Sequence, residues 1–323
     1  MTRAGLALVL LALAAPTATA ADAERLSIAT WNLEWMMTPA TFDALAANCL
    51  GSGHRAGGRE RAIPCNLAPH GRWSAEELAR LRAFAATLPL DVIALQETDG
   101  PEAAAQLFPG RAFCFTRRKH VQNVGFAIRR GIPFRCNDDY RALGLEDDDV
   151  RWGADLTLFP GTRRELRLLS VHLKSGCNRD PLTADRPDCQ VLRQQVPVLE
   201  QWIDRRARAG SAFAVIGDFN RRFDRESKQP RDASGRIAAM WPEIDDGDPA
   251  DADLVNAGSD YGPVGCANGH GKRVPIDHFV LGRRLARQLV AGSFRVWDYP
   301  SGKRWPDHCL VSIELELEAR HGL

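Results

Sequence analysis

The sequence lacks repeated segments, low-complexity blocks, Pro/Ser-rich linkers and, after its first residues, long hydrophobic runs. Only one apolar run stands out among the 323 residues, at Ala4 to Ala15. The absence of any other apolar run of about 20 residues argues against a protein with several membrane spans. The absence of linkers and repeats favours one large α/β domain over two small ones. We expect that domain to span residues 21–323.

The sequence also lacks an excess of charge of either sign. It has 42 basic and 41 acidic residues, and its formal net charge is +1 at pH 7. This balance excludes a strongly basic protein that coats nucleic acid, but it leaves open a nuclease with a local basic groove. Basic residues do gather locally, because the range 111–135 contains several arginines and Lys119 but no acidic residue.

The N-terminal residues have the pattern of a secretory signal peptide. Arg3 gives a short positive start, the apolar run follows it, and Ala18 to Ala20 form a small-residue cleavage site before Ala21. We therefore expect residues 1–20 to be removed and the mature protein to be secreted or periplasmic, without a transmembrane segment. An uncleaved membrane anchor is the alternative that the sequence leaves open.

Eight cysteines in a chain expected to be exported predict a disulfide framework. The simplest pairing joins sequence neighbours: Cys49–Cys65, Cys114–Cys136, Cys177–Cys189 and Cys266–Cys309. A zinc site is the competing interpretation, although no Cys-x-x-Cys knuckle is present. Its ligands would be Cys49, His54, Cys65 and His70.

Short hydrophobic runs that end in polar residues predict strands. They cover residues 26–32, 91–97, 124–128, 153–159, 166–172, 213–218, 276–281 and 309–317. A capping box at Ser74 begins a helix that reaches Leu88. An apolar stripe predicts a second helix over 191–203, which Pro197 should break or restart. Strands outnumber helices and alternate with them irregularly, which favours two packed sheets with helices outside.

Polar residues lie where these strands end, which is where α/β folds present active groups. They are Asn32, Glu34, Glu97, His172, Lys174, Asp218, Asn220, Asp277, Asp307 and His308. A single carboxylate after a strand usually caps a turn. A whole series of such ends instead indicates metal-assisted attack of water on a phosphate ester, a reaction that needs a cation site and a base.

The order of these motifs resembles the endonuclease/exonuclease/phosphatase superfamily of deoxyribonuclease I-like, metal-dependent phosphodiesterases. The matching segments lie within residues 26–317: Thr30-Trp31-Asn32, Leu95-Gln96-Glu97, Val171-His172-Leu173-Lys174, Gly217-Asp218-Phe219-Asn220, Ile276-Asp277-His278 and Pro306-Asp307-His308. The resemblance implies an α/β four-layer sandwich, in which two packed, mostly antiparallel β-sheets are flanked by helices. It also implies a hydrolase that acts on phosphate ester bonds.

The resemblance implies a metal site and assigns its ligands. Glu97 would be the principal ligand of Mg²⁺, with Mn²⁺ or Ca²⁺ as alternatives, because a hard cation prefers oxygen donors. Asn32 and Asp307 would complete the site. For Glu34, the sequence leaves open a second metal contact or a surface charge.

The same resemblance assigns the proton transfers. His308 would take a proton from the attacking water, Asp277 would orient His308, and Asp218 would orient the water. Asn220 would donate a hydrogen bond to a phosphoryl oxygen of the substrate. His172 would act on the leaving oxygen, and abasic-site endonucleases lack a histidine at this position.

Two further residues are candidates for binding substrate phosphate. Arg151 precedes the strand expected at 153–159, and Lys174 follows His172. For Lys174, solvation of a loop is the alternative. We expect the other histidines to be polar loop residues: His54, His70, His120 and His270.

One position departs from the resemblance. The superfamily usually has a small polar residue before the Asp-His pair, and here Pro306 stands there with Trp305 ahead of it. Proline has no backbone N–H to donate. We expect a rigid aromatic rim beside the site.

Together these features predict a secreted, divalent-metal-dependent phosphodiesterase that acts on DNA or RNA. The basic residues of 111–135 and of 221–225 would contact the nucleic acid. A sphingomyelinase-like phospholipid phosphodiesterase is the alternative and would need an exposed hydrophobic hairpin, for which Trp297 to Pro300 is the one candidate. A phosphomonoesterase is a further alternative. A non-catalytic binding module is the least favoured, because no residue of the series is lost.

Overall fold

The computed structural model describes residues 24–49, 61–146, 150–249, 252–259, 276–300 and 303–318. The expected signal peptide, residues 1–20, lies outside these ranges, so the division into a leader and one domain stays a prediction. Within the ranges just given, no helix is both long and apolar enough to span a membrane.

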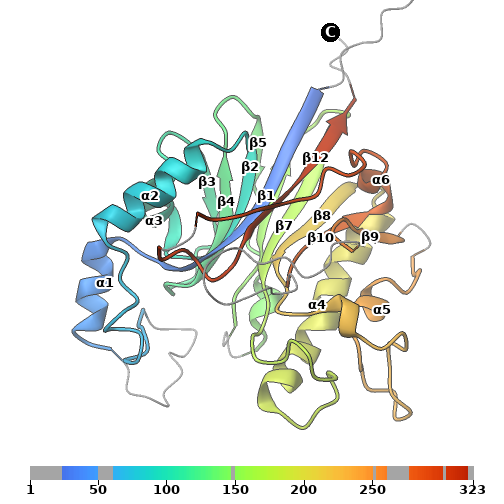
Figure 1. Cartoon of the computed structure of the whole chain (residues 1–323). Coiled ribbons are helices and arrows are strands. Elements are labelled where there is room, and N and C mark those ends of the chain that lie inside the picture. Colours follow the sequence, from blue (N-terminus) through green and yellow to red (C-terminus); the bar gives the residue numbers. More distant parts are fainter. Residues whose placement is uncertain are drawn as a thin grey trace, which may run out of the picture.

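Two six-stranded sheets pack face to face (Figure 1). The first has the strand order β11 (Arg295–Trp297), β12 (Leu310–Leu317), β1 (Glu24–Met36), β2 (Val92–Thr98), β4 (Asn123–Ile128), β3 (Ala112–Phe115). The second has the order β5 (Phe134–Cys136), β6 (Ala154–Leu158), β7 (Leu166–His172), β8 (Ala212–Asp218), β10 (Asp277–Gly282), β9 (Leu254–Asn256). Only the central pairs β1–β2 and β7–β8 are parallel, which confirms the prediction of mostly antiparallel sheets.

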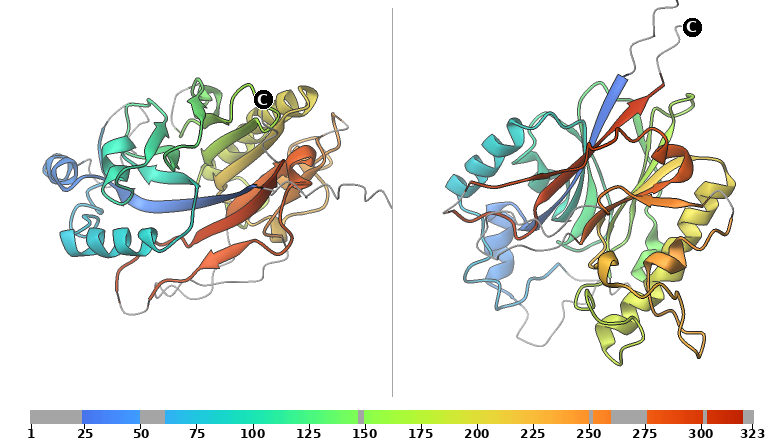
Figure 2. Two further views of the ribbon diagram at one scale, coloured as in Figure 1. Left: turned by 90° about the horizontal axis from the view of Figure 1, so that it is seen from above. Right: turned by 45° about the vertical axis from the view of Figure 1, so that its right-hand side comes forward.

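Helices cover the outer faces of both sheets, which completes the four layers (Figures 1 and 2). On the side of the first sheet lie α1 (Pro39–Ala46), α2 (Ala75–Ala86) and α3 (Gly100–Ala105). On the side of the second lie α4 (Pro187–Arg208), α5 (Trp241–Ile244) and α6 (Arg283–Ala286), with 3-10 turns η1 (Arg141–Gly144) and η2 (Phe223–Arg225). Helix α2 begins at the predicted capping box, in which Ser74 and Glu77 bond each other's backbone N–H groups.

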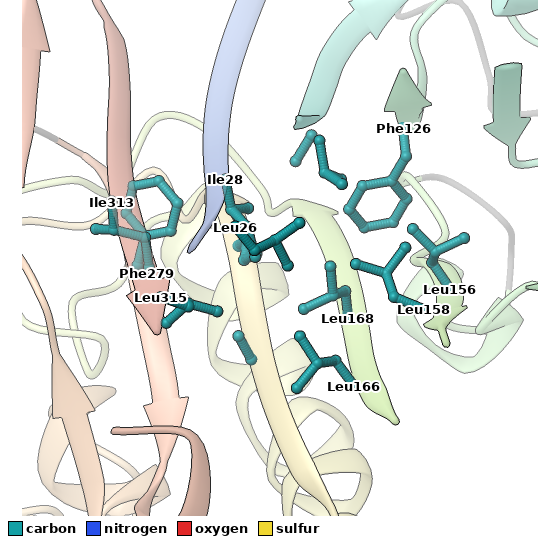
Figure 3. Close-up of a cluster of buried hydrophobic side chains, with 14 of the residues drawn as sticks. Leu26, Ile28, Phe126, Leu156, Leu158, Leu166, Leu168, Phe279, Ile313 and Leu315 are labelled. Carbon is teal, nitrogen blue, oxygen red and sulfur yellow. The ribbon is translucent and has the colours of Figure 1, made fainter. Parts of the chain in front are cut away.

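The largest apolar core lies between the two sheets (Figure 3). Side chains alternate between the faces of a strand, so every second residue points into this gap. Leu26 and Ile28 of β1 thus meet Leu166 and Leu168 of β7. Burial of each such leucine stabilises the fold by about 2 kcal/mol relative to exposure to water.

Helix α4 corrects one prediction. It runs without interruption through Pro197, where the sequence predicted a break or a new start. A proline inside a helix costs about 3 kcal/mol because it removes one backbone hydrogen bond. Here the helix buries Leu192, Val196, Leu199 and Trp202 against the second sheet, and this packing spans both sides of the proline. The buried apolar surface therefore outweighs the lost hydrogen bond.

Three of the four predicted disulfides are present: Cys49–Cys65, Cys114–Cys136 and Cys177–Cys189. The zinc interpretation is therefore wrong, because the sulfurs of Cys49 and Cys65 are bonded to each other. Cys266 lies outside the described residues, so the fourth pair stays a prediction.

Candidate active site

The inner faces of the sheets change from apolar to polar at one end of the molecule, away from the C-terminus marked in Figure 1. The alternation that places leucines in the core continues to the strand ends. The last inward positions there carry Asn32, Gln96, His172, Asp218 and Asp277. Sequence segments that are far apart therefore bring their polar ends together by strand pairing alone.

A buried polar layer separates these residues from the apolar core. The side-chain oxygen of Gln96 accepts a hydrogen bond from the Thr30 hydroxyl at 3.1 Å, and its nitrogen lies 3.3 Å from the Ser170 hydroxyl. Gln96 therefore links the two sheets beneath the site. The sequence placed Gln96 in a motif but gave it no role.

Asp218 lies at the centre of the site. Its Oδ2 accepts a hydrogen bond from Asn32 Nδ2 at 3.2 Å and lies 3.4 Å from His172 Nε2. Its Oδ1 accepts the backbone N–H of Asn220 at 2.7 Å. Burial raises the pKa of Asp218 to about 7, and the carboxylate of Asp277 adds to this rise while His308 opposes it.

His308 and Asp277 form a close pair. His308 Nδ1 lies 2.7 Å from Asp277 Oδ2, and His308 Nε2 lies 3.7 Å from Asp218 Oδ2. Burial alone would lower the pKa of His308, but the charges of Asp277 and Asp218 overcome this effect and raise the pKa well above its usual range. The imidazole is thus held by one carboxylate and directed toward another.

Carboxylates crowd the other side of the site. Glu97 accepts hydrogen bonds from Asn32 Nδ2 at 3.3 Å and from the backbone N–H of Trp35 at 3.2 Å. Burial and the charge of Asp307 raise the pKa of Glu97. Burial and the charge of Asp307 also raise the pKa of Glu34 to about 7, although the Arg304 guanidinium, 3.7 Å from the Glu34 carboxylate, opposes this rise. These groups repel one another, and a divalent cation would relieve that repulsion.

The oxygen donors of this carboxylate cluster fit a hard divalent cation such as Mg²⁺. A second group, Asp218, Asp277 and His308, also offers donor atoms within 4.8 Å of one another. In that group, however, His308 Nδ1 and Asp277 Oδ2 already share a hydrogen bond. A cation bound by both atoms would have to break this bond, so the cluster around Glu97 is the better cation site.

The backbone is strained around the site. Among the described residues other than glycine, six have a positive φ, and four of them are Glu34 (47°), Trp35 (56°), Glu97 (53°) and Asn220 (52°). Such conformations cost about 1–3 kcal/mol each and gather at functional sites. At Glu97 the strain breaks the strand alternation and lets a carboxylate next to Gln96 reach Asn32 on the inner face.

The end of β7 carries a second set of predicted residues. The Arg151 guanidinium donates hydrogen bonds to the carbonyl oxygens of His172 at 3.1 Å and Leu173 at 2.7 Å. Asn220 Nδ2 also donates to the Leu173 carbonyl, at 3.0 Å. Burial and then the charge of Arg151 lower the pKa of His172 well below its usual range, so this imidazole is neutral. Lys174 Nζ lies 2.6 Å from Asp188 of α4.

Two expectations about aromatic residues are wrong. Trp305 is buried, stacks on Tyr299 at 4.9 Å between ring centroids, and therefore forms no exposed rim. Tyr299 is also buried, so the segment Trp297 to Pro300 is not an exposed hydrophobic hairpin. Hydrophobic packing against Trp31 and Phe84 draws these rings inward.

The basic range 111–135 does not form one continuous track. Arg111 and Arg129 lie at the far end of the first sheet, where both contact Asp91. Only the turn 116–122, between β3 and β4, lies on the side of the candidate site. Arg221, predicted to contact nucleic acid, is buried and bonds the carbonyl of Cys177.

A sequence profile of the Endonuclease/Exonuclease/phosphatase family matches residues 29–319. A search of curated proteins gives no match. Among solved structures, TDP2 from Caenorhabditis elegans has a TM-score of 0.56 at 14% identity, covering 91% of this chain and 74% of that chain. The AP endonuclease LMAP from Leishmania major has a TM-score of 0.53 at 17% identity, covering 90% of this chain and 88% of that chain. The 3′ phosphatase NExo from Neisseria, bound to a product DNA hairpin, has a TM-score of 0.51 at 17% identity, covering 90% of this chain and 99% of that chain. These structures share the four-layer fold with the chain.

Proposed function

Because the chain belongs to the Endonuclease/Exonuclease/phosphatase family and is thus a hydrolase of phosphate esters, we propose that it is a divalent-metal-dependent phosphodiesterase that acts on nucleic acid. The observation that carries the proposal is the position of His308. Its Nδ1 is held by Asp277 at 2.7 Å, while its Nε2 faces Asp218 at 3.7 Å. A base oriented by one carboxylate and facing a second polar group is the arrangement that activation of a water molecule requires.

Each residue of the candidate site has a separate role in the proposed reaction. His308 Nε2 accepts a proton from a water molecule that Asp218 orients. Asp277 accepts a hydrogen bond from Nδ1–H in both protonation states of His308 and stabilises the imidazolium that forms. The positive charge of a cation held by Glu97 would oppose the rise in the pKa of His308 and favour the neutral base that accepts the proton. His172 Nε2 lies 3.4 Å from Asp218 Oδ2 and is placed to donate a hydrogen bond to a phosphoryl or leaving oxygen. Asn220 Nδ2 donates to the Leu173 carbonyl, so a hydrogen bond from Asn220 to a phosphoryl oxygen would use the second N–H of the amide.

A divalent cation, Mg²⁺ in the first instance, would be held by Glu97, Asn32 and Asp307, with Glu34 beside it. When bound, it would neutralise the negative charge that develops on the phosphate. The fit is supported by the burial and the crowding of the carboxylates there, which together raise the pKa values of Glu97 and Glu34.

Nucleic acid is the proposed substrate for two reasons. Two of the similar structures are named for action on DNA or hold a DNA product. In addition, no described residues form the exposed hydrophobic hairpin that a phospholipid phosphodiesterase would need. Export of the protein is part of the proposal, since the N-terminal sequence has a signal-peptide pattern and the described disulfides suit an oxidising compartment.

A parallel assay of plasmid DNA, RNA, sphingomyelin and a phosphomonoester, with Mg²⁺ and with chelator, tests the proposal. We expect cleavage of DNA or RNA that requires the metal. Preferred hydrolysis of sphingomyelin or of the monoester would assign the protein to an alternative substrate class. Absence of hydrolysis of every phosphodiester in Mg²⁺, Mn²⁺ and Ca²⁺ would refute the proposal.

A further inference from the structure

Arg221 and Glu226 form an ion pair whose side chains are only 3% and 2% exposed. Arg221 directly follows Asn220, and the sequence predicted that it would contact nucleic acid. A buried ion pair is stable only if further hydrogen bonds satisfy both groups, because each charge has lost its contact with water. The further partners of Arg221 lie in segments that carry the candidate site.

The Arg221 guanidinium bonds the loop that follows β7. Its Nη1 donates hydrogen bonds to the carbonyl oxygens of Cys177 and Asp180, both at 2.6 Å. The side chain of Asn220 donates to the Leu173 carbonyl of the same loop at 3.0 Å. Two consecutive residues, one with a proposed role in the reaction and one without, are therefore held by one loop.

The loop that accepts these bonds is joined covalently to α4 by the Cys177–Cys189 disulfide, and both cysteines are fully buried. The other member of the ion pair is held as well. Glu226 accepts hydrogen bonds from the backbone N–H groups of Met240 and Trp241, at 2.9 and 2.6 Å. The guanidinium is thus oriented from two sides before any substrate binds.

The backbone of Arg221 contacts strand β10. Its carbonyl oxygen accepts a hydrogen bond from His278 Nε2 at 2.8 Å. His278 follows Asp277, the carboxylate that holds His308. Arg221 therefore links three segments that carry proposed catalytic groups, which are the loop after β7, the turn 218–220 and the beginning of β10.

The turn itself needs such support. Asn220 has a φ of 52°, in the left-handed region that residues other than glycine rarely adopt. A conformation of this kind persists only where the surrounding structure holds it. The backbone N–H of Asn220 is bonded to Asp218 on one side, and the bonds of the Arg221 side chain fix the chain on the other. Loss of these bonds would let the turn relax and would move the Asn220 amide.

We propose that Arg221 is a positioning residue for the hydrolysis, which it supports by holding the turn that carries Asn220 against the loop after β7. This inference rests on the proposed function and adds to it a residue that contacts neither the substrate nor the metal. The guanidinium keeps the second N–H of the Asn220 amide directed at the phosphoryl oxygen. A misplacement of a catalytic group by about 1 Å can lower the rate about a hundredfold.

A double-mutant cycle tests whether Arg221 acts through Asn220, with a fluorescent DNA duplex and an RNA of the same sequence as probes in Mg²⁺. Arg221→Lys keeps the charge but lacks the planar fork of the guanidinium. We therefore expect kcat to fall about ten- to a hundredfold with little change in KM. In Asn220→Ala, the same substitution should lower kcat by less than about twofold further, because the group that it misplaces is already absent.

Arg167→Lys is the matched control. Arg167 lies 2.9 Å from Asp155 on the outer face of the second sheet, and the two side chains are 16% and 8% exposed. This variant also removes a planar fork from a largely buried ion pair, but it should keep kcat within about twofold of the wild type. If thermal unfolding shows that Arg221→Lys is not folded, Glu226→Gln repeats the cycle, since the amide keeps the shape of the pair and weakens it. Its smaller loss of kcat should likewise disappear in Asn220→Ala.

Hydrogen exchange of the segment 218–222, measured by mass spectrometry in chelator, gives a second readout that does not depend on catalysis. We expect faster exchange there in Arg221→Lys than in the wild type or in Arg167→Lys. A wild type that cleaves neither probe would refute the proposed function, and the exchange comparison would then decide the inference alone. Full additivity of the Arg221 and Asn220 losses, or unchanged exchange in the segment, would overturn the inference.

Discussion

The hydroxyl of Tyr299 lies 2.6 Å from the carbonyl oxygen of His308 and donates a hydrogen bond to it. The same hydroxyl accepts a hydrogen bond from the indole N–H of Trp31 at 2.6 Å, and Trp31 precedes Asn32 in the sequence. Tyr299 therefore connects the backbone of His308 to strand β1, which carries a proposed metal ligand. Because the group is buried among aromatic rings, water cannot replace either bond.

Replacement of Tyr299 by Phe should lower kcat about tenfold and leave KM nearly unchanged, because His308 would lose its fixed position while the binding residues stay in place. The loss of two buried hydrogen bonds should also lower the free energy of unfolding by about 1–3 kcal/mol. Steady-state kinetics and chemical denaturation measure the two effects.

Tyr140→Phe is the matched control for this variant. The Tyr140 hydroxyl also donates to a backbone carbonyl, that of Val198 on α4 at 2.7 Å, but it packs between α4 and the second sheet and touches none of the described residues that have a proposed catalytic role. It should destabilise the protein without lowering kcat. Similar kinetic losses in both variants would show that general stability, and not the position of His308, accounts for the effect.

Glu97→Gln should remove the stabilisation that Mg²⁺ gives to the wild type. A ligand that binds only the folded state at about one hundred times its Kd adds about 2.7 kcal/mol to stability. The amide keeps the size of Glu97 but lacks the charge that holds the cation. Thermal unfolding over a range of Mg²⁺ concentrations measures this shift. If Mg²⁺ raises the unfolding temperature of Glu97→Gln as much as that of the wild type, the cation does not bind at Glu97.

Glu200, on α4, should make the stability of the fold depend on pH independently of the metal. Burial and the neighbouring carboxylates of Glu243 and Asp246 raise its pKa from 4.5 to about 7. The folded state therefore favours the protonated group, and the stability that this gives is full below pH 4.5 and lost as pH rises through 7.

Glu200→Gln should accordingly stabilise the protein at pH 8, by about 1 kcal/mol after allowance for solvent screening, and have little effect at pH 4. Urea denaturation at both pH values measures the difference. Equal stability of wild type and variant at pH 8 would refute the raised pKa. Since Glu200 lies away from the carboxylate cluster, this variant also serves as the control for Glu97→Gln in Mg²⁺.

The long elements could be predicted because their signals are local. The capping box at Ser74 and the apolar run that became β7 carry all the information that their formation needs. The short edge strands β3, β5, β9 and β11 were missed, because three or four residues give too little periodicity. Pro197 was misjudged because the packing that tolerates it comes from the second sheet, which a local pattern does not contain.

The residues of the candidate site likewise fall into those that a local sequence motif predicts and those that it does not. Residues at strand ends, such as His308 and Asp218, stand out in the sequence because their motifs are short and ordered. Tyr299 was missed, because its importance comes from partners that are distant in sequence. The inward positions of Trp305 and Tyr299 likewise depend on rings from α2 and β1.

The most direct test of the account is cleavage of supercoiled plasmid DNA in Mg²⁺ by the wild type and by His308→Ala. His70→Ala, which changes an exposed histidine that has no proposed role in the site, is the control. The account predicts cleavage by the wild type and the control, none in chelator, and a loss of about 10²–10⁴-fold or more in folded His308→Ala. Cleavage by His308→Ala at the wild-type rate, or wild-type cleavage that survives full chelation, would contradict it.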